Sequence, residues 1–190
     1  ILKGCHYKGG FDCVAIYLRN NPESRFFSKK GLILGGSHSP SPLNSEAHQG
    51  DLSAVLLQNL NPLVNLIRVP KKPIILMDEW ESKIKAIVEN TWNKDVNSLS
   101  GVPSWMLVLI KAVLKKTGRE YLTDVWPNLE VFFHGGISFE PYREQYKTLI
   151  PSNKMHYMET YNASEGFFGL QDDPTDPSLL SLIHISEPTR

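Results

Sequence analysis

Residues 129–160 read LEVFFHGGISFEPYREQYKTLIPSNKMHYMET, and this stretch indicates the fold most clearly. Residues 129–134 form an apolar run that ends in two glycines, the pattern of a buried strand. Residues 141–149 then place a proline in the first turn of a predicted helix, and residues 155–160 form a second short strand. Strand, helix and strand in this order favour an α/β fold, a layered sheet with helices on its faces and right-handed crossovers.

The same alternation continues upstream of this stretch. Residues 31–36 form a short apolar run bounded by glycines and predict a strand, and residues 96–99 predict another short strand. Residues 77–92 have the clearest amphipathic pattern: Trp80, Ile84, Ile87 and Val88 share one face, and Lys83 belongs to the polar side. Pro103 opens a second predicted helix at residues 105–116, which Gly118 closes.

The amino-terminal third is predicted with shorter elements. Residues 11–20 predict a helix that ends where Pro22 prevents its continuation. Residues 37–50 are rich in serine and proline, so we expect a loop there. Asp51 is placed to cap a following helix that runs to about Leu60.

Charge and hydropathy exclude some classes of partner. The 190 residues include 20 basic and 20 acidic side chains, and this balance gives no clustered positive surface for nucleic acid. No apolar run approaches the roughly 20 residues needed to cross a bilayer, so no membrane partner is expected. Cys5 and Cys13 are too few for a disulfide scaffold, which favours the cytoplasm.

The residues best suited to bind a ligand follow two of the predicted strands. Gly135 and Gly136 would let a flat ring or a phosphate approach the backbone, since neither has a Cβ. After the next strand, Tyr161 can stack on a base, Ser164 can bond a phosphate oxygen and Glu165 can ligate Mg²⁺. Ligands of open α/β sheets bind at such ends, so these residues predict a nucleotide-triphosphate site. The alternative is that both segments are plain turns.

A resemblance to known enzymes favours the first interpretation. Residues 129–136 and 161–165 resemble two core motifs of the adenylate-forming superfamily. Nearly all of residues 1–179 resemble the bacterial branch of the auxin-responsive acyl acid–amido synthetase family. The likeness is strongest at residues 101–105 (GVPSW), 126–130 (WPNLE) and 161–169 (YNASEGFFG).

The resemblance implies a role for each of these residues. The backbone of Gly135, Gly136 and Ile137 would line the adenine pocket, and Tyr161 would pack against the base. Ser164 would contact the α-phosphate and Glu165 would ligate Mg²⁺, which makes them the expected catalytic pair. The acyl substrate would lie between the helix after Pro103 and the segment at Tyr161, and the residues that would line its pocket are Val102, Trp105, Asn162 and Phe167.

The resemblance also defines the expected domain. Residues 1–179 would be part of the large amino-terminal domain of an adenylate-forming enzyme. The family's phosphate loop, its ribose-binding aspartate and its mobile carboxy-terminal domain have no counterpart in these residues, so we expect the true protein to extend in both directions and this segment alone to be inactive. Residues 180–190, LSLIHISEPTR, resemble a translated sequencing adapter and are excluded from the fold.

The resemblance implies an ATP-dependent ligase that adenylates a carboxylic acid and transfers the acyl group to the amine of an amino acid. Its cofactors would be ATP and Mg²⁺, and its partners a small carboxylic acid and an amino acid. Two alternatives stay open. One is an acyl-CoA synthetase, which shares the first half-reaction but forms a thioester. The other is a non-catalytic nucleotide-binding α/β module.

Overall fold

The computed structural model describes residues 3–41, 44–62, 64–173, 176 and 179–181. Within these residues, seven strands form one mixed sheet in the order β4-β1-β5-β6-β7-β8-β9. The parallel part comprises β4 (Arg68–Val69), β1 (Lys30–Ile33), β5 (Val96–Gly101), β6 (Val131–Gly135) and β7 (His156–Ala163). The strands β8 (Gly166–Leu170) and β9 (Leu180–Ser181) continue the sheet in antiparallel orientation. The predicted α/β fold is confirmed.

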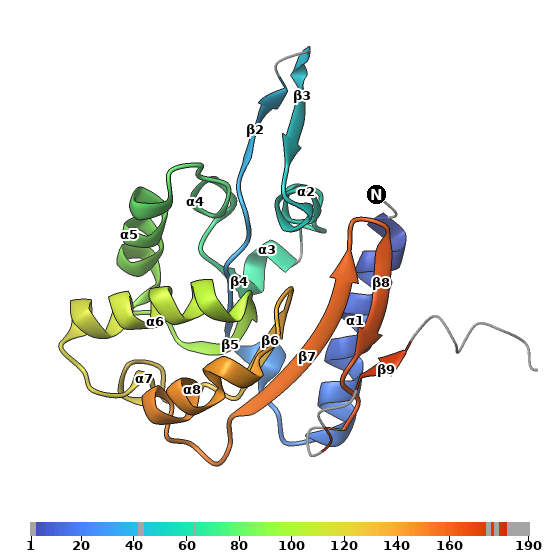
Figure 1. Ribbon diagram of the computed structural model, residues 1–190. Helices are drawn as coiled ribbons and strands as arrows, with labels where there is room; N and C mark the ends of the chain where they lie inside the picture. The colour runs from blue at the N-terminus through green and yellow to red at the C-terminus, as the bar shows by residue number, and fades with distance from the viewer. Residues whose placement is uncertain (1–2, 42–43, 63, 174–175, 177–178, 182–190) are drawn as a thin grey trace, which may run out of the picture.

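Helices cover both faces of the sheet (Figure 1). On one face lie α5 (Trp80–Thr91), α6 (Pro103–Thr117) and α8 (Arg143–Leu149), and on the other lies α1 (Lys3–Asn20). The shorter helices are α2 (Leu52–Gln58), α3 (Val64–Ile67), α4 (Lys72–Ile75), α7 (Leu122–Val125) and the 3₁₀ turns η1 (Phe26–Ser28) and η2 (Glu140–Tyr142). None of the helices in the described part of the chain combines the length and hydropathy that a membrane span requires.

Strand β6 shows why the sheet has two apolar layers. Successive side chains of a strand point to opposite faces. Phe132 therefore joins the large core beneath α5, α6 and α8, whereas Val131 packs with Tyr17 of α1 and Met158 of β7. Phe133 lies on the same side as Val131, and its ring centroid is 5.8 Å from that of Tyr17. The run at residues 129–134 is apolar throughout because both its faces are covered.

Local signals set the ends of α6 correctly. Pro103 lies at the start of the helix, where its missing N–H costs no hydrogen bond. Gly118 ends the helix in the left-handed conformation, with φ of +66°, and its N–H donates to Leu114 O at 2.9 Å. The predicted helix and its glycine stop are confirmed.

The structure corrects the expectation for residues 37–50. Residues 38–41 and 44–50 form a two-stranded antiparallel ribbon, β2 (His38–Ser41) and β3 (Asn44–Gly50), which extends beyond the sheet in Figure 1. The prediction of a loop was wrong because proline is tolerated in an edge strand, and each strand of a two-stranded ribbon is an edge. The helix after it, α2, begins at Leu52, but the Asp51 carboxylate makes no cap hydrogen bond and instead accepts from Ser37 N at 3.2 Å.

The structure also corrects the placement of Lys83. Its side chain is 2% exposed, and Nζ donates to Gly35 O at 2.7 Å and to Gly36 O at 3.0 Å. The helix α5 thus turns this lysine toward the carboxyl end of β1 rather than toward solvent. Burial lowers the pKa of the Lys83 amine, while the charges of Asp51 and Asp78 raise it. Helical periodicity assigned Lys83 to the polar side because it cannot detect carbonyl groups that another strand supplies.

Candidate functional site

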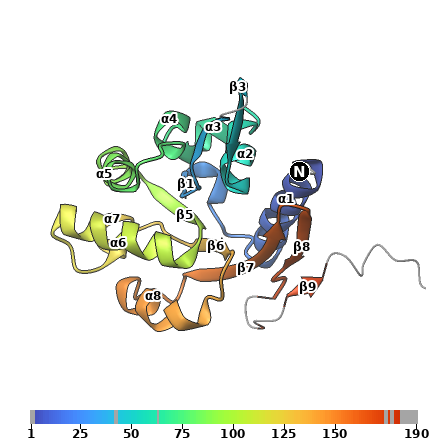
Figure 2. The ribbon, with the colours of Figure 1, turned by 45° about the horizontal axis from the view of Figure 1, so that its top comes forward.

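The carboxyl ends of β5, β6 and β7 meet at one edge of the sheet (Figures 1 and 2). Gly101 at the end of β5 pairs with His134, and Gly135 at the end of β6 pairs with Thr160. The next residues along the three strands are Val102, Gly136 and Tyr161. All three therefore lie at the edge where ligands of open α/β sheets bind.

Each of the two glycines at the end of β6 has a structural reason. A Cβ on Gly135 would lie 2.4 Å from Thr160 O and 2.8 Å from Thr160 Oγ1, so only glycine fits against β7. Gly136 has a φ of +84°, a conformation that side chains disfavour, and the position of its Cβ lies 3.4 Å from Val102 Cγ2. Gly135 thus has a packing reason for lacking a Cβ, and Gly136 presents exposed backbone beside Val102.

Replacing Gly135 by alanine is expected to lower the free energy of unfolding by about 1–3 kcal/mol, because the new methyl group would overlap backbone atoms of β7. Urea unfolding followed by circular dichroism measures the change. The control is Gly10→Ala on an exposed turn of α1, where a Cβ meets nothing within 4 Å. That variant should be as stable as the parent or more stable by up to about 1 kcal/mol. Equal stability of the two variants would contradict the prediction.

Tyr161 lies within a β-hairpin, whereas the predicted strand ended at residue 160. Strand β7 continues through Ala163 and pairs with β8, and the residues between the two strands are Ser164 and Glu165. The pairing shifts between Tyr161 and Asn162, an irregularity of the kind that re-aims side chains near active sites. The Tyr161 ring is 55% exposed, and its centroid lies 5.7 Å from that of Phe168.

Ser164 and Glu165 are both exposed at the turn of this hairpin. They follow Thr160, the last residue paired with β6, by four and five positions. At about 3.3 Å per strand residue, the turn lies roughly 13–17 Å along the chain from that pair. Their predicted contacts with phosphate and Mg²⁺ therefore concern the tip of the hairpin, whereas Gly136 and Tyr161 lie at its base.

Mg²⁺ binds through one or two carboxylates, substrate phosphates and water rather than through a cage of protein ligands. The described residues contain no group of three or more His, Cys, Asp or Glu side chains placed to hold a metal ion. A single exposed carboxylate such as Glu165 fits the way in which this ion is held beside nucleotide phosphates.

The four residues predicted to line the acyl pocket are divided between two regions. Val102 precedes α6, and Trp105 in its first turn is 40% exposed, with its ring centroid 5.6 Å from that of Trp80 on α5. Asn162 and Phe167 are paired with each other in the hairpin. The Phe167 ring packs on Gly9 of α1, where a Cβ would lie 2.3 Å from it.

The sheet separates these two regions. Phe167 packs on α1, which covers one face of the sheet, whereas Trp105 belongs to α6 on the opposite face. The structure therefore does not place Phe167 against Trp105. Trp80 was not among the predicted pocket residues, although it lies beside Trp105. Its position on the apolar face of the predicted helix was read as core packing, and sequence spacing alone cannot distinguish a core aromatic from one at a pocket wall.

A cluster of buried aromatic rings packs next to the carboxyl end of β6. The His134 ring stacks on Phe139 with centroids 4.2 Å apart and an interplanar angle of 26°. Phe139 in turn stacks on Tyr157 at 4.9 Å and contacts Tyr146 at 5.2 Å. Burial and, as the smaller cause, the positive charge of Arg143 lower the pKa of His134 to about 3, so the imidazole is neutral near pH 7. Apart from the aromatic residues themselves, no sequence pattern indicated this cluster.

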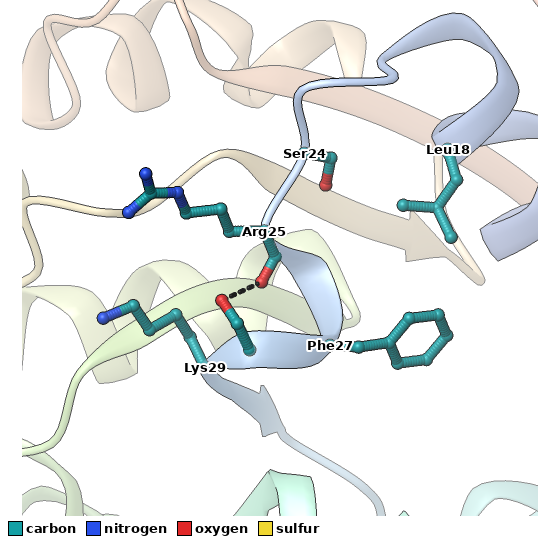
Figure 3. Close-up of a pocket in the computed structure, with 6 residues that line it drawn as sticks. Leu18, Ser24, Arg25, Phe27 and Lys29 are labelled. Atoms are coloured by element: carbon teal, nitrogen blue, oxygen red, sulfur yellow. Dashed lines mark hydrogen bonds between the residues drawn. The ribbon is translucent and has the colours of Figure 1, made fainter.

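A cavity of about 530 Å³ lies at the opposite edge of the sheet, next to the amino end of β1 (Figure 3). In Figure 3 the side chains of Arg25 and Lys29 extend to one side, while Leu18 and Phe27 lie on the other. Lys29 forms an ion pair with Asp95, and Ser28 Oγ donates to Arg25 O at 2.8 Å. These residues are remote along the strands from Gly136 and Tyr161, so the cavity is separate from the candidate site.

The chain matches the model of the GH3 family N-terminal domain over residues 4–155. The matched range includes the helix α6, the two glycines and the cluster residues His134, Phe139 and Tyr146, and it ends before Tyr157 and the hairpin. No match to the chain was found among curated proteins. The match spans most of the 190 residues and agrees with the resemblance at residues 101–105 and 126–130. This chain belongs to the GH3 family, the family of acyl acid–amido synthetases.

Proposed function

We propose that the complete protein is a cytoplasmic ATP-dependent ligase of the bacterial branch of its family. In the first half-reaction a carboxylate oxygen attacks the α-phosphorus of ATP and pyrophosphate leaves, which gives an acyl-adenylate. In the second, the amine of an amino acid attacks the acyl carbon and AMP leaves, which gives an amide. The mixed anhydride makes the carbonyl reactive, as the free carboxylate is not.

One observation carries this proposal: Gly135 pairs with Thr160, so the exposed backbone of Gly136 and the exposed ring of Tyr161 flank the same strand end. A base could lie between them, with its phosphates extending along the hairpin toward Ser164 and Glu165. Ser164 would donate a hydrogen bond to an α-phosphate oxygen, and Glu165 would hold Mg²⁺. The bound ion would supply charge neutralisation as pyrophosphate leaves.

The chain's own residues would mainly bind and orient the reactants. Holding the carboxylate in line with the α-phosphorus converts an encounter in solution into a step within one complex, which supplies much of the acceleration. Val102 and Trp105 lie at the same strand edge and would form the wall of the acyl site. We also propose that residues 1–179 belong to a larger amino-terminal domain and that residues 180–190 derive from an adapter. Leu180 and Ser181 of that segment, which we had excluded from the fold, pair with β8 as β9, and residues 182–190 lie outside the described residues.

The test is acid-dependent release of pyrophosphate by the product of the complete gene, with ATP, Mg²⁺ and a panel of carboxylic acids. We expect release with some acids, followed by AMP and amide formation when amino acids are added. Formation of a thioester with coenzyme A, without amide, would support the acyl-CoA synthetase alternative. ATP binding without release for any acid would support the non-catalytic module.

A further inference from the structure

The loop after β6 is exposed, but both of its ends are buried. Gly136, Ile137 and Ser138 are exposed, and Ile137 retains 39% of its accessible surface. The residue before the two glycines, His134, is 2% exposed, and the residue that closes the loop, Phe139, is 1% exposed. The segment offered to solvent thus has a buried ring at each end.

These two rings hold each other. The rings of His134 and Phe139 stack with centroids 4.2 Å apart and an interplanar angle of 26°, the shortest centroid distance in this cluster. The stack links residues five positions apart in the sequence. Offset stacks of this kind contribute beyond their buried area. The loop between them therefore begins and ends at one contact, which restricts the conformations open to its backbone.

Neighbouring elements fix both rings in turn. Strand β7 holds the backbone of His134, because Thr160 Oγ1 donates to His134 O at 3.1 Å. The Phe139 ring stacks on Tyr157 of β7, and the central carbon of the Arg143 guanidinium lies over the same ring at 5.1 Å from its centroid. The rings are thus attached to β7 and to α8, and the loop has no need of its own contacts to hold its shape.

Burial of the His134 imidazole is unfavourable for the stability of the fold. Its Nδ1 is buried and has no hydrogen-bond partner within the described structure, and such groups destabilise a fold unless something compensates. The charged groups around the cluster are Arg143, Glu140 and Glu159, which pairs with His134 across the strands. Burial raises the pKa of Glu159, Arg143 lowers it and Glu140 raises it. A ring retained here despite an unpaired nitrogen indicates a role beyond core packing.

We propose that His134 and Phe139 are positioning residues, whose stacked rings hold the backbone of residues 135–138 in the conformation that receives the adenine base. Neither ring is expected to touch the nucleotide. The inference rests on the proposed function, because it assumes that this loop binds ATP. Its consequence is selective: loss of the stack should weaken the binding of ATP and leave the binding of the carboxylic acid unchanged.

The experiment compares His134→Ala and His134→Phe in the complete protein, with KM measured separately for ATP and for the acid and with ATP binding measured by calorimetry. For His134→Ala we expect KM and Kd for ATP to rise about tenfold and KM for the acid to change less than twofold. For His134→Phe, which restores a ring, both ATP constants should return to within about threefold of the parent.

A second variant and a control keep the test decisive. Phe139→Leu retains apolar bulk but removes the other ring, and it should reproduce the ATP-selective defect even if His134→Ala fails to fold. Phe26→Leu removes ring contacts with Tyr17 and Phe133 on the opposite face, and it should leave both KM values unchanged.

Several results would overturn the inference. These are an unchanged Kd for ATP in His134→Ala and Phe139→Leu, an equal rise of both KM values, or no recovery in His134→Phe. If the parent binds ATP but releases no pyrophosphate, the proposed function fails while the calorimetric comparison still decides the inference. If the parent does not bind ATP at all, the positioning role is refuted as well.

Discussion

Glu165→Gln in the complete protein is expected to reduce acid-dependent pyrophosphate release by at least about 100-fold, because losing one electrostatic contact to the transition state typically costs a factor of this size. The substitution removes a charge and leaves the shape almost unchanged. Glu165 is exposed at the hairpin turn, so the fold should not respond to the change. Initial rates at saturating ATP and acid, over a range of Mg²⁺ concentrations, measure the effect.

A matched control separates the loss of a metal ligand from the loss of any surface charge. Glu144→Gln removes an exposed carboxylate of α8, whose partner is Lys147 at 2.9 Å. Exposed ion pairs of this kind contribute little to stability. Its rate should stay within twofold of the parent. Pyrophosphate release that is equally fast in Glu165→Gln and in Glu144→Gln would eliminate Glu165 as the Mg²⁺ ligand.

Lys83→Met is expected to lower the free energy of unfolding by about 2–6 kcal/mol, because two buried carbonyl oxygens lose their donor at about 1–3 kcal/mol each. Methionine approximates the length and apolar stem of lysine, so packing is largely retained. The carbonyl oxygens of Gly35 and Gly36 are left without the ammonium that now bonds both. Other contacts hold the same turn, since Gly36 N donates to Ser53 Oγ at 2.8 Å, and local loosening should accompany the loss.

Urea unfolding of the complete protein measures this change, and hydrogen exchange of residues 34–37 locates it. Lys85→Met is the control, because Lys85 is exposed on the same helix. Surface substitutions of this kind usually change stability by no more than about 0.5 kcal/mol. The interpretation of Lys83 as a structural donor would be refuted by equal stability of the two variants.

The elements predicted correctly from sequence are those whose signals are local. The helix α6 carries its own start at Pro103 and its own stop at Gly118, and both were found. The strand β6 was found because both faces are covered, which makes every residue from Val131 to Phe133 apolar. Local signals do not require knowledge of any partner, so a single sequence is enough to read them.

Two kinds of element were missed: strands whose pairing partner is set by the tertiary structure, and strands whose own sequence has no hydrophobic pattern. Strands β2 and β3 pair with each other outside the main sheet, and their sequence shows no hydrophobic alternation to detect. The extension of β7 into the hairpin depends on pairing with β8, and the predicted strand ended at residue 160. Phe167 was predicted beside the acyl site, yet its ring packs on Gly9 of α1, a contact across more than 150 residues.

The sequence by itself determined the α/β class, the alternation of helices and strands from α5 to β7, and the glycines and polar residues at two strand ends. The tertiary structure decided which of these residues are neighbours. It set Gly136 beside Val102, buried Lys83 against two carbonyl oxygens and joined His134 to Phe139. The reason is physical: backbone preference and hydropathy act within a few residues, whereas strand register and ring contacts depend on the position of the whole chain.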